Sequence, residues 1–114
     1  MKVIEKNEGP KIAYEVTGTK ITFGDDELTI NVAKYQRDWP VHIDICSNRD
    51  EQLAIGTGEG LYYVAQLDIP AIKYLVSEFT EPESEEETPE PLPIDMKDVV
   101  LTLWSLENPV PAEI

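Results

Sequence analysis

The feature that most constrains this chain is an alternation of apolar and polar residues, with a period of two, that recurs through its first seventy positions. Positions 41 to 46 read Val-His-Ile-Asp-Ile-Cys, so aliphatic side chains occupy every second place. Successive side chains of a β-strand point to opposite faces, and the pattern therefore predicts a strand with one buried face. This stretch also holds the only histidine and the only cysteine of the chain, which makes it the first place to look for a site.

Similar alternating runs follow one another with turn residues between them. They cover residues 11–17, 20–23, 28–35, 52–55 and 61–67, and turns such as Gly18-Thr19 separate them. Residues 61–67 are apolar on both faces, which predicts a strand in the middle of a sheet. Short strands at this spacing predict a mainly β fold, either a small antiparallel sandwich or a barrel of about seven strands.

The second half of the chain divides by composition. After Asp68 the apolar residues fit either a strand or a short helix near residues 71–79, and Pro70 at the first turn slightly favours the helix. Residues 80–93 are rich in glutamate and proline, which predicts a flexible acidic tether behind a β-rich core at 1–79. Residues 94–106 are expected to return as a terminal strand to the same core or to a neighbour's, followed by an irregular tail at 107–114.

The charge balance excludes several kinds of partner. Nine basic residues stand against twenty-three acidic residues, a formal net charge of -14 that repels phosphate backbones and anionic lipids. We therefore expect no nucleic-acid binding and no membrane partner. A single cysteine cannot form an internal disulfide, and no apolar run is long enough to span a membrane, so the expected compartment is the cytoplasm.

The sharpest cluster of reactive side chains is His42, Asp44 and Cys46, which share one face of a predicted strand. Neighbours two positions apart on a strand face stand about 7 Å apart, which is long for a shared metal ion, so the three are only a weak metal candidate. His42 and Cys46 are separated by about 13 Å at the usual rise, too far for a nucleophile and its base. The sequence predicts no catalytic residue, no cofactor and no enzyme.

Three aromatic residues are the candidates for binding a protein partner. Tyr35 and Trp39 flank a loop on the side of the chain away from the predicted core, where exposed aromatic side chains suit an interface. Trp104 lies in the terminal strand and offers a large apolar area that has to be covered.

The function expected from these features is a non-catalytic protein-interaction or assembly module, with self-association among its contacts. By analogy of fold alone, small acidic β modules of this kind also suit phage or virion accessory proteins. One alternative is an acidic mimic of nucleic acid that occupies a nucleic-acid-binding protein. A second alternative is a small-molecule binder or small enzyme in which Tyr62, His42 and Asp44 line the mouth of a barrel.

Overall fold

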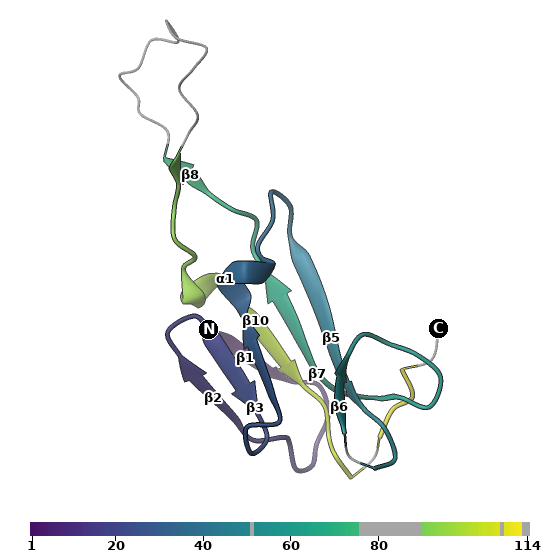
Figure 1. Ribbon diagram of the computed structural model, residues 1–114. Coiled ribbons are helices and arrows are strands. Elements are labelled where there is room, and N and C mark those ends of the chain that lie inside the picture. Colours follow the sequence, from purple (N-terminus) through teal and green to yellow (C-terminus); the bar gives the residue numbers. More distant parts are fainter. Residues whose placement is uncertain (51, 76–89, 108, 113–114) are drawn as a thin grey trace, which may run out of the picture.

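The computed structural model describes residues 1–50, 52–75, 90–107 and 109–112 (Figure 1). Its elements, in chain order, are β1 (Lys2–Glu5), β2 (Tyr14–Thr17), β3 (Lys20–Phe23), β4 (Leu28–Asn31), α1 (Val32–Tyr35), β5 (Val41–Ser47), β6 (Leu53–Ile55), β7 (Tyr62–Ile69), β8 (Tyr74–Leu75), β9 (Glu90–Pro91), the 3-10 turn η1 (Met96–Asp98) and β10 (Val100–Leu103). None of the helices in these residues is long and apolar enough to cross a membrane. The predicted mainly β fold is confirmed.

The strands form two principal sheets. The larger sheet has the order β1-β10-β7-β5-β6, the smaller has the order β2-β3-β4, and β8 and β9 make a separate two-stranded ribbon. The neighbouring strands pair antiparallel except β1 and β10, which run parallel. Strand β7 is the central strand of the larger sheet, as its apolar residues on both faces predicted.

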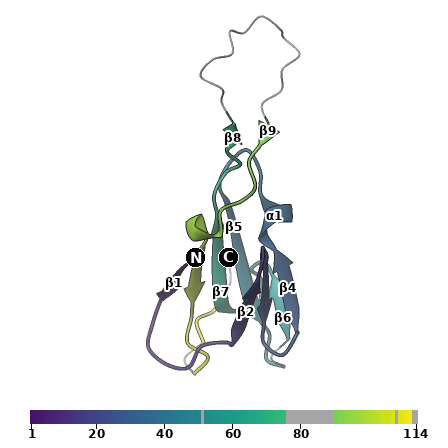
Figure 2. The same ribbon diagram turned by 90° about the vertical axis from the view of Figure 1, so that its left-hand side faces the viewer.

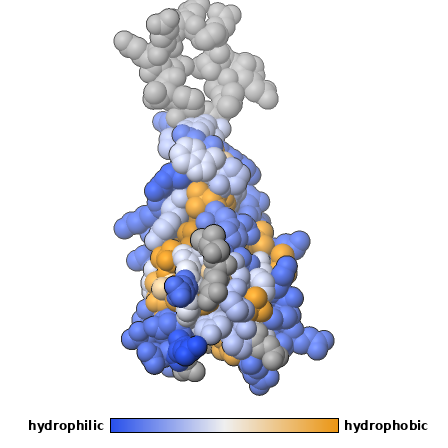
Figure 3. All heavy atoms as spheres, turned by 90° about the vertical axis from the view of Figure 1, so that its right-hand side faces the viewer, coloured by the Kyte–Doolittle hydropathy of each residue, from blue (hydrophilic) through white to orange (hydrophobic). Residues whose placement is uncertain are grey.

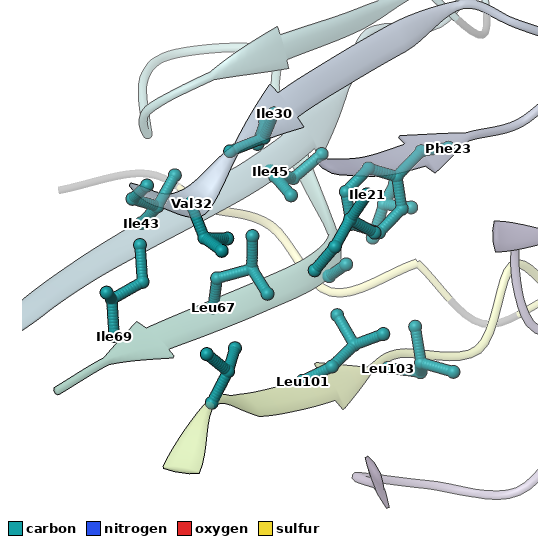
Figure 4. Close-up of a cluster of buried hydrophobic side chains, with 13 residues drawn as sticks. Ile21, Phe23, Ile30, Val32, Ile43, Ile45, Leu67, Ile69, Leu101 and Leu103 are labelled. Atoms are coloured by element: carbon teal, nitrogen blue, oxygen red, sulfur yellow. The ribbon is translucent and has the colours of Figure 1, made fainter. Parts of the chain in front are cut away.

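The two sheets bury one core between them. Ile21 and Phe23 of β3 and Ile30 of β4 meet aliphatic side chains from β5, β7 and β10 (Figure 4). The core residues of the larger sheet sit at alternate positions of their strands, for example Ile43 and Ile45, and all of these side chains are at most 5% exposed. The fold is therefore an antiparallel sandwich with one parallel pair at its edge.

A β-bulge interrupts the alternation in β7. Ile45 is paired with Ala65 and Cys46 with Tyr63, so Val64 is the extra residue on the β7 side. An extra residue shifts the phase of a strand by one, and as a result the consecutive Val64 and Ala65 are both buried in the core.

Two predictions of local structure were wrong. The run expected to continue as a strand to residue 35 ends at Asn31, whose side chain accepts a hydrogen bond from the N–H of Ala33 (3.2 Å) and so caps α1. The helix favoured near 71–79 is absent from its described part, because Tyr74 and Leu75 form β8 and pair with Pro91 and Glu90. Residues 76–79 lie outside the described residues.

The C-terminal part of the chain re-enters the larger sheet. Strand β10 lies between β1 and β7 of its own chain, and beyond it Pro111 forms an isolated antiparallel bridge with Tyr62. Of the acidic segment at 80–93, residues 80–89 lie outside the described part of the chain, and its last residues form β9 and the connection to η1.

The two sheets differ in width, and this difference leaves one side of the sandwich open. The larger sheet has five strands and the smaller three, and β1 stands beyond β2 on the same side of the molecule (Figure 2). Both strands are edges of their sheets, and every residue of both is exposed. We call this region, formed by β1 and β2, the open side.

Candidate functional site

The predicted site residues His42 and Asp44 lie on the outer face of the larger sheet. Their neighbours Ile43 and Ile45 point into the core, so alternation turns His42 and Asp44 away from it. The antiparallel register of β5 and β7 sets Asp68 opposite His42 and Gln66 opposite Asp44. Four polar side chains from two strands are thus brought together on one face.

His42 makes a hydrogen bond from each of its ring nitrogens to a carboxylate. Its Nδ1 lies 2.7 Å from Oδ1 of Asp68, and its Nε2 lies 2.7 Å from Oδ1 of Asp44. The pKa of His42 is raised above its ordinary value of 6.5, chiefly by the hydrogen bond to Asp68 and further by Asp44, while partial burial opposes the shift. An ionised carboxylate can only accept, so both contacts are satisfied at once by the imidazolium form.

This arrangement limits the chemistry of His42. A general base or a metal ligand needs a ring nitrogen with a free lone pair, and the doubly protonated ring has none. Within the part of the chain that the structure describes, no group of three or more His, Cys, Asp or Glu side chains is placed to hold a metal ion. We interpret His42 as a positive charge that lies between two carboxylates and holds β5 against β7.

The hydrogen-bonded row continues to an aromatic pair. Gln66 donates from Nε2 to Oδ1 of Asp44 (2.9 Å) and accepts at Oε1 from the indole N–H of Trp104 (2.9 Å). The Trp104 ring stacks on Tyr63 with centroids 4.9 Å apart, and Nζ of Lys6 lies 5.7 Å from its centroid. Trp104 is half-buried by these contacts, so its indole is anchored in the sheet face.

Cys46, the third residue of the predicted cluster, is separate in its environment from the other two. Its side chain is completely buried, and burial, followed by the charge of Asp44, raises the pKa of the thiol to about 11. A thiol with this pKa is almost fully protonated at neutral pH and is a poor nucleophile and a poor metal ligand.

Sequence reasoning missed Asp68, Gln66 and the stack of Tyr63 on Trp104. A usable signal was present, because Gln66 and Asp68 alternate with the apolar Ala65, Leu67 and Ile69 and so had to face away from the core. What the sequence did not contain was the register that places them beside His42.

The remaining predicted partner residues have different surroundings. Trp39 is 61% exposed in the loop before β5, as expected for a surface aromatic. Tyr35 is partly buried and packs against the core at the end of α1, so it offers less surface than expected. Tyr62 belongs to β7 and bridges to Pro111. His42 and Asp44 lie on the solvent-exposed outer face of the larger sheet and do not line the mouth of a barrel.

Apolar side chains are scattered over the face that Figure 3 shows, which is opposite to the face seen in Figure 2. In Figure 3 the hydrophobic residues form small separate patches among hydrophilic ones. A surface of this kind gives a partner no continuous apolar area, so the sheet edges are better suited to an interface than this face.

The open side carries apolar residues that are directed inward and yet exposed. Tyr14 is paired with Phe23, and Val16 is paired with Ile21, so both share the core face of the smaller sheet. Val3 is likewise paired with the buried Leu101. These three side chains are nevertheless 38% (Tyr14), 40% (Val16) and 41% (Val3) exposed, because no strand of the opposite sheet covers them completely.

The backbone of the open side is also available for pairing. Lys2 and Lys6 donate their N–H groups to Val99 and Leu103, so alternation turns the N–H and C=O groups of Val3 and Glu5 outward. Ala13 accepts from Gly24 across β2 and β3, which by the same alternation leaves Tyr14 and Val16 with outward backbone groups. An added strand would meet donors and acceptors on either edge.

Comparison of the chain with protein-family models, with curated proteins and with solved structures found no match.

Proposed function

We propose that this protein is a non-catalytic assembly module that binds a second copy of itself through the open side. The observation that carries the proposal is the exposure of Val3, Tyr14 and Val16, which face the interior of the sandwich and lack a covering strand. Exposed edge strands with apolar side chains are templates for pairing with another chain.

The distribution of charge favours a second copy at this place. Residues 1–17 contain three lysines and three glutamates, while the rest of the chain holds six basic and twenty acidic side chains. Two copies of a protein with a net charge of -14 repel each other over most of their surface. The two strands of the open side and their connection, residues 1–17, carry no net side-chain charge, so that repulsion is weaker there.

The opposite side of the sandwich is less suitable for self-association. There Glu27 and Asp50 line one shallow pocket with Gln52 and with Leu53, the first residue of β6. A second copy approaching β4 and β6 would bring a second set of these carboxylates close to the first, which costs free energy.

The geometry favours a pairing of β2 with β2 of the second copy. An antiparallel pair about a two-fold axis joins the two three-stranded sheets into one sheet, and each added strand then lies over Val3 of the other copy. Registers that place Tyr14 or Val16 on the axis avoid setting the two copies of Glu15 opposite each other. Four residues a strand give a small interface, so the association is expected to be weak and dependent on concentration.

Sedimentation equilibrium of the full chain tests the proposal directly. From low micromolar to millimolar concentration, the mean mass is expected to rise from that of one chain towards that of two. Val16→Glu and Val3→Glu are expected to keep the mass at that of one chain, because each puts a like charge into the interface.

Ile4→Glu is the matched control. Ile4 lies next to Val3 and is 38% exposed, but it is on the outer face of the sheet. The substitution therefore adds the same charge to the same strand without placing it in the proposed interface. It is expected to leave the association intact. A wild-type chain that stays single at every concentration, or an Ile4→Glu variant that dissociates as fully as Val3→Glu, would contradict the proposal.

A further inference from the structure

A small pocket with both apolar and polar lining lies at the end of the sandwich where the β3–β4 turn and the β5–β6 connection meet. Its volume is about 240 Å³, and its lining comprises Ile12, Gly24, Glu27, Ser47, Leu53, Val64 and Leu106. Four of these seven residues carry aliphatic side chains. Val64 is only 2% exposed and belongs to the core, whereas Leu106 is 46% exposed at the rim.

The volume fits a small organic group. An apolar cavity of about 150 Å³ in another protein is large enough to bind benzene, so a chain or ring of similar size can be accommodated here. The aliphatic lining favours a hydrocarbon portion over a polar one, because contact with it removes apolar surface from water on both sides.

Glu27 is the one charged residue of the lining, and its side chain lies against Gly24. A Cβ atom built at Gly24 would lie 3.1 Å from Cδ and 3.2 Å from Oε2 of Glu27, so the carboxylate folds back over the glycine. Gly24 has a φ of +67°, which glycine adopts without strain. Among the described lysine, arginine and histidine residues, none forms an ion pair with Glu27.

The surroundings of Glu27 strengthen its attraction for a cation. Asp50 lines a neighbouring pocket together with Glu27, and the chain as a whole carries a net charge of -14. Neighbouring carboxylates raise the local concentration of cations and lower that of anions.

We propose that this pocket binds an aliphatic ammonium group. The hydrocarbon portion lies against Ile12, Leu53, Val64 and Leu106, and the ammonium remains at the rim, where the Glu27 carboxylate and the Ser47 hydroxyl accept its hydrogen bonds. The group belongs either to a free small amine or to a lysine side chain of a protein. The inference does not depend on the self-association proposed above, since Val3 and Val16 are not part of this lining.

Methyl spectra of the full chain labelled at isoleucine, leucine and valine test the proposal, because all four aliphatic lining residues carry methyl groups. The probes are isopentylammonium, isopentanol and isovalerate, which share one branched five-carbon skeleton and differ in charge. Isopentylammonium is expected to shift the methyl signals of the lining saturably, isopentanol to bind more weakly, and isovalerate to cause no saturable shift. Equal affinity for the ammonium and the alcohol, or no saturable shift with any probe, would overturn the proposal.

Paired variants separate a specific contact from the general charge. Glu27→Gln is expected to weaken isopentylammonium binding roughly fivefold, the effect of losing one exposed ion pair. Asp25→Asn removes the same charge from the same turn but lies outside the lining, and it is expected to change the affinity by much less. An equal loss in both variants would show that only the net charge matters and would refute the site.

A further titration distinguishes the two sources of the ammonium group. The probe is lysine with its α-amino group acetylated and its carboxyl group amidated. Binding at least as tight as that of isopentylammonium identifies a lysine side chain of a protein as the natural occupant. Weaker binding identifies a free amine.

Discussion

Replacing His42 by glutamine should reveal how much the charged row on the outer face stabilises the fold. The variant keeps a side chain that can donate hydrogen bonds but removes the positive charge between Asp44 and Asp68. Both lost ion pairs have an N···O distance of 2.7 Å, with side-chain exposures of 47% for His42, 23% for Asp44 and 54% for Asp68. Exposed pairs contribute up to ~1 kcal/mol each, so the expected loss is about 1 to 1.5 kcal/mol.

The size of this loss depends on pH. The pKa of His42 is raised in the folded chain, which means that the folded chain binds the proton more tightly than the unfolded chain does. The stabilisation is therefore complete below the unfolded pKa of about 6.5 and disappears as the pH rises through the folded pKa. Below about pH 5 the carboxylates begin to take up protons, and the difference falls again.

Urea denaturation of the wild type and of His42→Gln at about pH 5.5 and about pH 9 measures the effect. The free energies of unfolding should differ by about 1 kcal/mol at the lower pH and by close to zero at the higher pH. Asp68→Asn should reduce the dependence on pH without abolishing it, because Asp44 remains. A difference that is the same at both values, or larger at the higher pH, would refute the account of His42 as a charge bound between two carboxylates.

Three further predictions follow from the packing. Leu67→Ala should lower the free energy of unfolding by about 2 to 5 kcal/mol in urea titrations, since this side chain is fully buried, whereas Thr17→Ala in the exposed β2 should change it by less than ~0.5 kcal/mol. The Cys46 thiol should react with a disulfide reagent at about pH 8 only after denaturant is added, and rapid reaction of the folded chain would be the contrary result. Truncation after Pro91 removes β10 from between β1 and β7, and it should lower the melting temperature and the solubility; an unchanged melting curve would count against the docked strand.

Period-two alternation predicted most of the strands because burial of one face dominates their energetics. Ile43, Ile45 and Leu67 sit where the pattern placed them, at the interface of the two sheets. The end of β4 was not predictable in the same way. The carboxamide oxygen of Asn31 accepts from the Thr19 hydroxyl (2.8 Å), twelve residues earlier in the chain, and from Ala33, and these contacts depend on the fold of the hairpin.

The candidate site depends even more on contacts between residues that are far apart in the sequence. His42 and Asp44 were singled out by their residue types, but their partner Asp68 is 26 residues from His42 and became visible only through the register of β5 and β7. The bulge at Val64 shifts the phase of β7 relative to the residues before it, and no local signal predicted it. The open side likewise depends on a comparison of the two sheet widths, which is a property of the assembled sandwich.

Amide hydrogen exchange measured at several protein concentrations tests the central claim, association of two copies through β2, most directly. In a single chain the N–H groups of Tyr14 and Val16 point away from the sheet, while that of Glu15 is directed to β3. The account predicts that Tyr14 and Val16 exchange rapidly in dilute solution and become protected as the concentration rises, with Glu15 protected throughout. Exchange at Tyr14 and Val16 that stays fast up to millimolar concentration would contradict it.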